Sequence, residues 1–531
     1  MIHEKGYSIP DEYRQILILT LSFAPDSSKS EPSPYTTLRD DSFIFHMWEK
    51  PTYQLYSDVW VYNYTNVPEF LAGEESVLKL EEIGPFTFIE ERLNLNLTID
   101  KERGVARMRP KTSLHFLPEQ SIGHYKDINV TVPNLAVLAI STLLADELGY
   151  FANAGAYMSM NAMGSKLFRN MTVEEYLWGY YDPIVKFANT LLPGWIDFAE
   201  IGILDRFYAD KNSHIEVMLK DKDSRYSIIS WDDSPGLKEQ GYRDWNTSVP
   251  CNRIRGAYEG LMLSPGFSKD RELPIFRKQG CRVYPFSFES EKIGDYGLNE
   301  YRFSLQQSAF NRSSRYACAC DSQCLPDGFV DIGGCYYGFP IALSKPHFLD
   351  VDPAQKANFE GMHPDPEKHS SHLNVEPTYG IPLSLVSNIQ ANIAVRTSPY
   401  NPITKPLNDK IMPLVWLSLY CKSPPPEIID ILRLRFVIAP PLIITVEVLL
   451  FLAGFLLGVQ GFYRLFKGQR TEVKKRPRSV ITILENKTFK AHSEHSKEVA
   501  SLLAVNDEDL ELPDIITTND GYDSRIERNS N

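Results

Sequence analysis

The sequence predicts an α+β fold, with a large body rich in β-strands, a helical insertion within that body, and one membrane-spanning helix near the C-terminus. Three observations indicate this arrangement. Runs of aromatic and β-branched residues flank the middle of the body, the middle itself has the apolar spacing of helices, and residues 436–459 are almost entirely apolar.

The strand-like runs are short and are separated by Gly, Pro, Asn and Asp, which favour turns. Aromatic and β-branched side chains suit a half-buried pleated surface, so we expect each run to form a strand. The clearest runs are VWVYNYT (59–65), GPFTFIE (84–90), YSIISW (226–231) and CRVYPFSF (281–288).

The helical insertion is expected between Pro133 and about Leu204. It contains LAVLAISTLLADELGYFANAGAYMSMNAMGSKLF (135–168) and TVEEYLWGYYDPIVKFANTLL (172–192), whose apolar residues recur at helical intervals. Thr172 and Glu175 have the spacing of a capping box, in which each side chain bonds the other residue's backbone N–H. A helix is therefore expected to begin at Thr172.

The apolar run near the C-terminus, residues 436–459, contains a single ionisable side chain, Glu447. As a helix it would extend about 36 Å, against about 30 Å for the hydrocarbon core of a bilayer. A buried core helix is the alternative, and the length of the run favours a membrane span. We therefore expect an N-terminal segment (1–39), a large domain (40–435), a transmembrane helix (436–463) and a tail (464–531).

A cluster of cations directly follows the apolar run, and such an excess marks the cytosolic side of a membrane. The large domain is then expected in the lumen or outside the cell, with the tail in the cytosol. Asn-x-Ser/Thr sequons in that domain fit this orientation, because glycosylation occurs on the lumenal side. They lie at Asn63, Asn96, Asn129, Asn170, Asn246 and Asn311.

Composition and motifs narrow the class of function. The chain of 531 residues has a net charge of −13, which argues against a nucleic-acid partner. No G-x-S-x-G motif, phosphate-binding glycine loop or dinucleotide fingerprint occurs in the sequence. His369 and His372 are candidate metal ligands by residue type, but the helical His-Glu-x-x-His frame is missing. We therefore expect neither an enzyme nor a cofactor or metal requirement.

Six of the seven cysteines lie within residues 251–335, in the part expected to face an oxidising compartment. Zinc is the rival interpretation, but C-A-C followed by S-Q-C does not form two knuckles of the usual spacing. Disulfides are therefore expected. Spacing alone leaves about 15 pairings open for six cysteines.

Long stretches of the chain resemble the class B scavenger receptor family, which includes fatty-acid translocase, lysosomal integral membrane protein type 2 and the insect sensory neuron membrane proteins. The resemblance covers roughly residues 40–465. The stretches that carry it are WEKPTYQLYSDVWVYNYTNVPEFLAGE, GPFTFIEE, TVEEYLWGYYDP, CLPDGFVDIGGCYYGFPIALSKPHFLDVDP and GMHPDPEKHSSHLNVEPTYGIPLSLVSNIQANI.

The resemblance implies an antiparallel β-barrel core, a helical bundle at the membrane-distal apex, and an apolar tunnel that leads lipid toward the bilayer. It also implies three disulfides, namely Cys251 with Cys318, Cys281 with Cys335, and Cys320 with Cys324. Only three residues separate the last two cysteines, which makes that pair the least regular. Cys421 is interpreted as a buried free thiol, with a bridge to another chain as the alternative.

Methionines in the helical insertion raise the question of ligand contact. Met158, Met160 and Met163 have flexible thioether side chains, which suit varied apolar cargo. Filling of the core is the more common use of such residues, and periodicity alone does not decide which face is exposed.

Both termini carry features that bear on targeting. Family members begin with a hydrophobic anchor, whereas ILILTLSFA (16–24) is too short to span a bilayer, so we expect a missing or truncated anchor, with a weak cleavable signal as the alternative. In the tail, Glu498, Leu502 and Leu503 match the acidic dileucine pattern that clathrin adaptors recognise.

The sequence thus favours a scavenger-receptor-like membrane glycoprotein that binds lipids or lipoprotein-like ligands and passes apolar cargo toward the membrane. It would reside in the plasma membrane, in endosomes or lysosomes, or in both. A lysosomal sorting receptor for a soluble hydrolase and a structural lysosomal membrane glycoprotein are the alternatives. A second copy of the chain is a further candidate partner.

Overall fold

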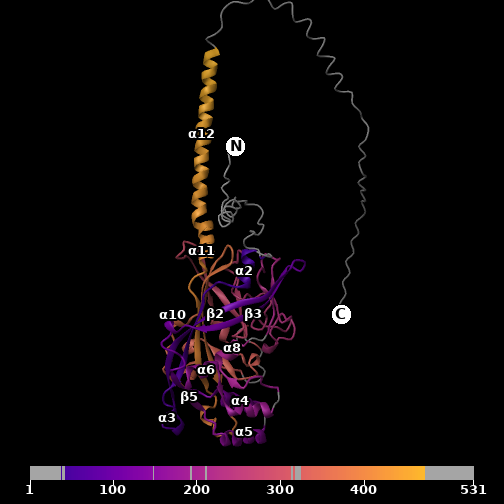
Figure 1. The fold of residues 1–531 in the computed structure, drawn as a ribbon, viewed down its shortest axis with the longest axis vertical. Helices are drawn as coiled ribbons and strands as arrows, with labels where there is room; N and C mark the ends of the chain where they lie inside the picture. The colour runs from indigo at the N-terminus through magenta and orange to yellow at the C-terminus, as the bar shows by residue number, and fades with distance from the viewer. Residues whose placement is uncertain are drawn as a thin grey trace, which may run out of the picture. The chain divides into compact units, whose positions relative to one another are not determined.

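The computed structural model describes residues 38, 42–147, 149–191, 194–209, 212–312, 315–316, 318 and 324–472. The chain divides into two compact units, and the boundary lies between Ile443 and Ile444. The first unit holds the β-rich body (Figure 1). The second contains most of the long apolar helix.

Fourteen of the described strands of the body form one large sheet, and β4-β5 and β6-β7 form two separate pairs. Its main path is β10-β11-β12-β16-β17-β18-β1-β2-β3-β8-β9, and every pair along that path is antiparallel. The strands of the path are β1 (Leu55–Tyr64), β2 (Leu78–Asp100), β3 (Val105–Phe116), β8 (Ile215–Met218), β9 (Ile228–Trp231), β10 (Leu273–Arg277), β11 (Arg282–Ile293), β12 (Asn299–Leu305), β16 (His372–Glu376), β17 (Ile381–Ala394) and β18 (Ile411–Cys421). Short strands beside it are β13 (Val330–Asp331), β14 (Ile341–Ser344) and β15 (Phe359–Glu360).

All four strand-like runs lie in strands of this sheet, which confirms their prediction. VWVYNYT lies in β1 except for its last residue, GPFTFIE lies in β2, and CRVYPFSF lies in β11 except for its first residue. In the run YSIISW, the last four residues form β9. The fold class is accordingly a mixed α/β arrangement around a large antiparallel sheet.

The strands by themselves do not close a barrel, because the edge strands β9 and β10 are not paired with each other. The backbone of residues 256–258 lies between them and bonds to both. On one side Ile228 N–H donates to Ala257 C=O at 2.7 Å, and on the other side Tyr258 N–H donates to Pro274 C=O at 2.9 Å. The barrel implied by the resemblance is thus present as a curved open sheet whose two edges share one short connecting segment.

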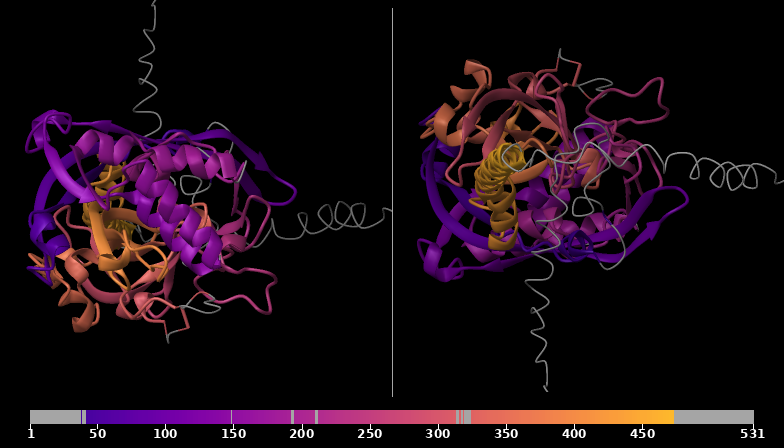
Figure 2. Two further views of the ribbon diagram at one scale, coloured as in Figure 1. Left: turned by 90° about the horizontal axis from the view of Figure 1, so that it is seen from below. Right: turned by 90° about the horizontal axis from the view of Figure 1, so that it is seen from above.

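The helical insertion lies at the end of the body opposite α11 (Figure 1). Its elements are β4 (Asn129–Pro133), α4 (Leu135–Glu147), α5 (Tyr150–Ala162), β5 (Phe168–Thr172), α6 (Val173–Trp178), β6 (Tyr180–Tyr181), α7 (Pro183–Leu191), β7 (Glu200–Ile201) and α8 (Ile203–Phe207). Residues 135–142 of α4 are buried on every side, since α5 and α7 cover the helix from outside. Figure 2 shows these helices crossing the end of the strand-built body.

The capping box predicted at Thr172 and Glu175 is confirmed. The Thr172 hydroxyl accepts from Glu175 N–H at 3.2 Å, and the Glu175 carboxylate accepts from Thr172 N–H at 2.8 Å. The helix is shorter than the apolar spacing suggests, because Gly179 adopts a φ of +147° and ends it. L-residues with a side chain rarely adopt that conformation.

The remaining described helices are short, except for those near the C-terminus. They are α2 (Phe43–Glu49), α3 (Val67–Ala72), α9 (Pro353–Lys356) and α10 (Pro366–His369), with 3₁₀ turns η1 (Pro118–Gln120), η2 (Lys238–Gln240), η3 (Gln307–Phe310), η4 (Gly333–Cys335), η5 (Pro346–Phe348) and η6 (Lys405–Leu407).

The apolar helix begins earlier than the sequence predicts. Helix α11 (Pro426–Arg433) continues through a π-helical turn, η7 (Leu434–Ile438), into α12 (Ala439–Glu472). The wide turn ends two residues before Pro440, and Pro440 and Pro441 lack the N–H groups that a regular helix would use there. Within the described residues, 426–467 form the one helix long and apolar enough to cross a membrane.

Candidate functional site

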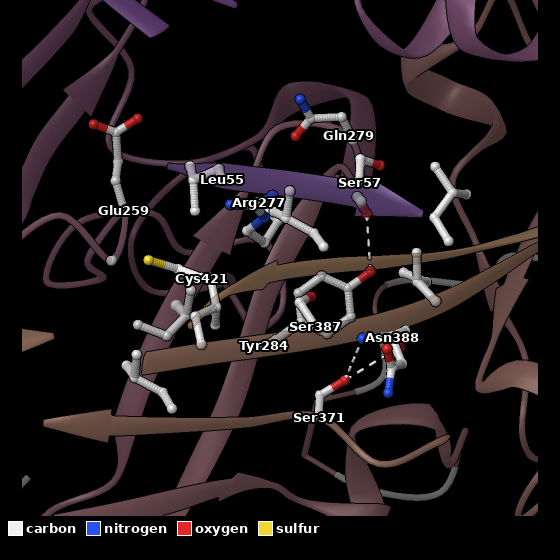
Figure 3. A pocket seen from close by; sticks show the side chains of 18 of the residues that line it. Leu55, Ser57, Glu259, Arg277, Gln279, Tyr284, Ser371, Ser387, Asn388 and Cys421 are labelled. Carbon is white, nitrogen blue, oxygen red and sulfur yellow. Dashed lines mark hydrogen bonds between the residues drawn. The ribbon is translucent and has the colours of Figure 1, made fainter. Parts of the chain in front are cut away.

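An elongated apolar cavity lies inside the curved sheet. The space free of protein atoms there is about 1490 Å³, part of it open to solvent. Its walls come from strands far apart in the sequence, chiefly β1, β10, β11, β17 and β18. Figure 3 shows the side chains of these strands around this space.

Strand alternation explains why the cavity is apolar. Side chains of a strand point alternately to its two faces, so residues two apart share one face. On β18 the cavity face carries Leu417, Leu419 and Cys421. The neighbouring strands continue the row, because Leu419 lies opposite Ser57 of β1 and Ser387 of β17. Small hydroxyl side chains on both sides of Leu419 leave room inside the sheet.

Two polar residues of the wall, Ser371 and Asn388, bond to each other. Ser371 donates its hydroxyl to Asn388 C=O at 3.2 Å and accepts from Asn388 N–H at 2.9 Å (Figure 3). Burial raises the pKa of Tyr284 to about 12 and that of Tyr208 well above its usual value. Both phenols are therefore neutral at physiological pH and present no charge to an apolar ligand.

Cys421 is the one free cysteine among the described residues, and it lies in the cavity wall. Its thiol donates to Ser423 C=O at 3.2 Å, and burial raises its pKa above the usual value. The thiol thus stays protonated, which agrees with its interpretation as a buried free cysteine.

A second, smaller apolar cavity continues the interior toward the helical insertion. It lies between α4 and the strands β14, β17 and β18, and its space free of protein atoms is about 450 Å³, part of it open to solvent. Phe207, at the end of α8, lines both cavities and so stands between them. At the other end the first cavity reaches Tyr53 and Leu383, which pack in one apolar cluster with Ile428 and Leu432 of α11.

The methionines considered as ligand contacts do not line either cavity. Met158 is 68% exposed on α5, Met160 is fully buried in the core, and Met163 is half-buried against it. Met160 accepts a bond from Ser141 of α4, so its thioether fills the space between the two helices. Strand positions, which carried no functional signal in the sequence, supply the cavity instead.

Among the described residues no group of three or more His, Cys, Asp or Glu side chains is arranged to hold a metal ion. His369 is buried and accepts from Asp365 N–H at 3.0 Å, while His372 is half-buried on β16. Burial is the main cause that lowers the pKa of both to about 4.

The cysteine loop is fastened by disulfides. Cys251 is bonded to Cys318 and Cys281 to Cys335, which are two of the pairs implied by the resemblance. The third, Cys320 with Cys324, includes a residue outside the described part of the chain. Also outside it lie the dileucine residues Glu498, Leu502 and Leu503.

The sequons differ in accessibility. Asn96, Asn129, Asn170 and Asn246 are exposed, whereas Asn63 and Asn311 are half-buried. Asn129 is the first residue of β4, and Asn170 lies in the middle of β5, where it donates its amide to Thr131 at 3.2 Å. At least the exposed four present side chains that a glycosyltransferase could reach.

Comparison with known proteins agrees with this architecture. A family model described as the CD36 family matches residues 15–465. Scavenger receptor class B member 1 of Cricetulus griseus is 28% identical over 85% of this chain and 86% of its own length. The protein of the same name from Mus musculus is 27% identical over 75% of this chain and 77% of its own length. Lysosome membrane protein 2 of Homo sapiens is 28% identical over 72% of this chain and 77% of its own length. The chain, a scavenger-receptor-like protein with one long apolar helix near its C-terminus, belongs to the CD36 family.

Proposed function

We propose that the protein is a membrane glycoprotein that binds lipids or lipid-bearing particles and passes apolar cargo toward the membrane through the interior of its sheet. The apolar cavity is the observation that carries this proposal. Its wall is continuous from Phe207 to Leu383, and Leu383 packs with α11, the helix that continues along the chain into the membrane-spanning candidate. Cargo leaving at that end would emerge beside the start of this helix.

The helical insertion would receive the cargo. The exposed face of α5 carries Phe151 and Met158, and the whole helix contains no charged residue. Contact with a lipid-bearing particle would bury this apolar surface. From there the interior leads past α4 and the smaller cavity to Phe207.

The orientation is proposed from the chain itself. Cations follow the apolar helix, and six of the seven sequons and both described disulfides precede it, so the body would face the lumen or the exterior. Binding without covalent chemistry agrees with relatives whose names are those of receptors and membrane proteins. Lysosomal residence is supported by the lysosome membrane protein among them, and adaptor binding at Leu502 and Leu503 would account for it.

The test is a transfer assay with the full chain reconstituted in liposomes. Labelled cholesteryl ester would be presented in lipid particles and its arrival in the liposome membrane followed. Ser387→Trp places a large ring in the cavity and should reduce transfer at least about tenfold, while Ser290→Trp, on the exposed part of β11, should leave it unchanged. Equal transfer by both variants would refute transport through the cavity.

Localisation is tested separately in cells. Tagged protein carrying Leu502→Ala and Leu503→Ala should move from lysosomes to the cell surface. Glycosidase digestion of the same samples should shift the band of the full chain. An unchanged distribution would remove adaptor sorting from the proposal, and an unshifted band would contradict a lumenal body.

A further inference from the structure

The turn between β11 and β12 lies beside the start of the apolar C-terminal helix. It comprises residues 294–298 and is closed by two backbone bonds, Gly294 N–H to Leu298 C=O at 2.9 Å and Gly297 N–H to Gly294 C=O at 3.0 Å. Gly297 adopts a φ of +74°, and a Cβ added to it would lie 3.5 Å from Cγ2 of Val437. The backbone of the turn therefore lies close to the π-helical turn η7.

Side chains of the turn pack with this part of the helix. Leu298 is fully buried in one apolar cluster with Ile428 and Leu432 of α11. Tyr296 of the turn and Phe436 of η7 pack against that cluster and are half-buried. All of these residues belong to the first compact unit. Packing thus fixes the position of the turn relative to the first residues of the apolar helix.

A second turn lies next to the first. Strands β12 and β16 pair with Tyr301 opposite Val375, so the residues that precede β12 lie near those that follow β16. The latter form the β16–β17 turn, residues 377–380. Its Tyr379 ring packs against the ring of Phe436, with centroids 5.4 Å apart. Both turns therefore lie against η7.

Ile293, the last residue of β11, is 69% exposed directly before the first turn. Among the described residues that precede α11 and lie outside the helical insertion, no other large apolar side chain is as exposed. A single exposed apolar side chain is ordinary on a protein surface. This one, however, adjoins a turn that packs against the beginning of the membrane-spanning candidate.

The charges around Ile293 limit how deeply this turn could enter a bilayer. Lys292 lies 3.9 Å from Glu300, whose side chain is 8% exposed, and such pairing lowers the cost of leaving bulk water. Asp295, within the turn, is exposed, and a carboxylate is costly in hydrocarbon. The turn therefore fits the headgroup layer of a bilayer rather than its core.

The length of the apolar helix agrees with that depth. As a helix, residues 436–463 extend about 42 Å, which is the thickness of a bilayer together with both of its headgroup layers. With Arg464 and the cations that follow in one headgroup layer, Phe436 would lie in the opposite one. Tyrosine is favoured at this depth, because its ring is apolar and its hydroxyl stays hydrated.

We propose that the β11–β12 turn is a second membrane contact of the body, in which Ile293 and Tyr296 rest in the headgroup layer of the bilayer that the C-terminal helix spans. The partner is the phospholipid surface, and because the contact is apolar and aromatic it requires no particular headgroup charge. The helix alone lets the body tilt and rotate about the helix axis, and a second contact restricts both motions. This inference needs only the membrane-spanning helix and does not depend on the proposed transport of lipid.

The experiment uses the full chain in nanodiscs of phosphatidylcholine. The fluorophore NBD is attached to Ile293→Cys, and the lipids carry a nitroxide quencher either at the headgroup or near the end of an acyl chain. Leu71→Cys is the matched control, since Leu71 is a 45% exposed residue of α3, at the end of the body opposite α11 (Figure 1). Parent protein treated with the same reagent corrects for any label on the buried Cys421.

Headgroup nitroxide should reduce the emission from Ile293→Cys at least about twofold, since the label would lie in the headgroup layer, and chain-end nitroxide should reduce it less. Emission from Leu71→Cys should stay unchanged with both lipids. Hydroxyl-radical footprinting of the unmodified chain in the same nanodiscs is the second measurement. There Ile293 should be oxidised more slowly than Leu71, although it is the more exposed of the two in the protein.

Equal quenching at the two positions, or quenching at neither, would overturn the membrane contact. Protection of Ile293 from oxidation without quenching would mean that protein rather than lipid covers it, and would overturn the proposal as well. If Ile293→Cys does not fold, the footprint of the unmodified chain decides, and oxidation of Ile293 at least as fast as that of Leu71 refutes the contact.

Discussion

The imidazole ring of His347 stacks on that of His369 with centroids 4.6 Å apart, inside the body and beside Trp416. The two rings belong to segments 22 positions apart in the sequence, the residue numbers being 347 and 369. His347 is also within 2.6 Å of Glu82, which accepts a bond from the Trp416 indole at 2.7 Å. The group therefore contains one carboxylate and two buried imidazoles in a protein with lysosomal relatives.

Acid should weaken the fold through His369. Burial, followed by the charges of His347 and Lys368, lowers its pKa from 6.5 to about 4, while Glu82 and Asp365 act in the opposite direction. The folded protein therefore favours the neutral form of His369. The contribution of His369 to the free energy of unfolding is complete above pH 6.5 and is lost as the pH falls toward 4. At about pH 5 the loss is on the order of 2 kcal/mol by proton linkage.

His369→Asn is expected to reduce that loss, since its amide oxygen can accept from Asp365 N–H and does not titrate in this range. Urea unfolding of the full chain at about pH 7.5 and pH 5 measures the difference. His363→Asn, at an exposed position nearby, is the control. The same pH dependence in the parent and in His369→Asn would exclude His369 as its source.

Thr172 is expected to serve both the helix cap and the Asn170 sequon. Thr172→Ala should lower stability by about 1 kcal/mol through loss of the cap and should also remove one glycan. Asn170→Gln should remove the glycan alone, and Thr172→Ser should retain both. Gel mobility reports the glycan, and thermal unfolding reports the stability that the cap contributes. An equal loss of stability in Thr172→Ala and Asn170→Gln would mean that the glycan, and not the cap, causes the loss.

The Cys281–Cys335 disulfide closes a segment with a sequence separation of 54 residues. Its removal by Cys281→Ser with Cys335→Ser should cost about 4 kcal/mol, according to the entropy of loop closure. Cys421→Ala changes a free buried cysteine and should have a much smaller effect. If the double variant does not leave the endoplasmic reticulum, titration of purified parent protein with reductant measures the joint contribution of this disulfide and Cys251–Cys318. Unchanged stability after reduction would contradict the prediction.

Phe207 should control passage between the two interior cavities. Phe207→Leu shortens the side chain that lines both of them, so lipid transfer should become faster. Phe329→Leu is the matched control, because Phe329 is equally buried and lines neither cavity. Both substitutions should cost about 1 kcal/mol of stability. Faster transfer in both variants would point to general loosening rather than to a gate at Phe207.

The local features of this protein follow from the sequence by itself. Side chains close together in the chain determine the predicted strands, the capping box at Thr172 and the long apolar helix. Their periodicity and capping residues can therefore be identified in the sequence. The family follows too, since its residues recur along most of the chain. These features are determined by short-range sterics, hydrogen bonds and hydrophobic patterning.

The cavity was decided only by the tertiary structure. No sequence pattern marks Ser57, Ser387 or Leu419 as cavity residues. They become neighbours because β1, β18 and β17 pair in one particular register. The Arg92–Glu259 ion pair likewise joins residues that are far apart in the chain. Register and sheet curvature set which side chains face inward, and both depend on long-range pairing that no local pattern encodes.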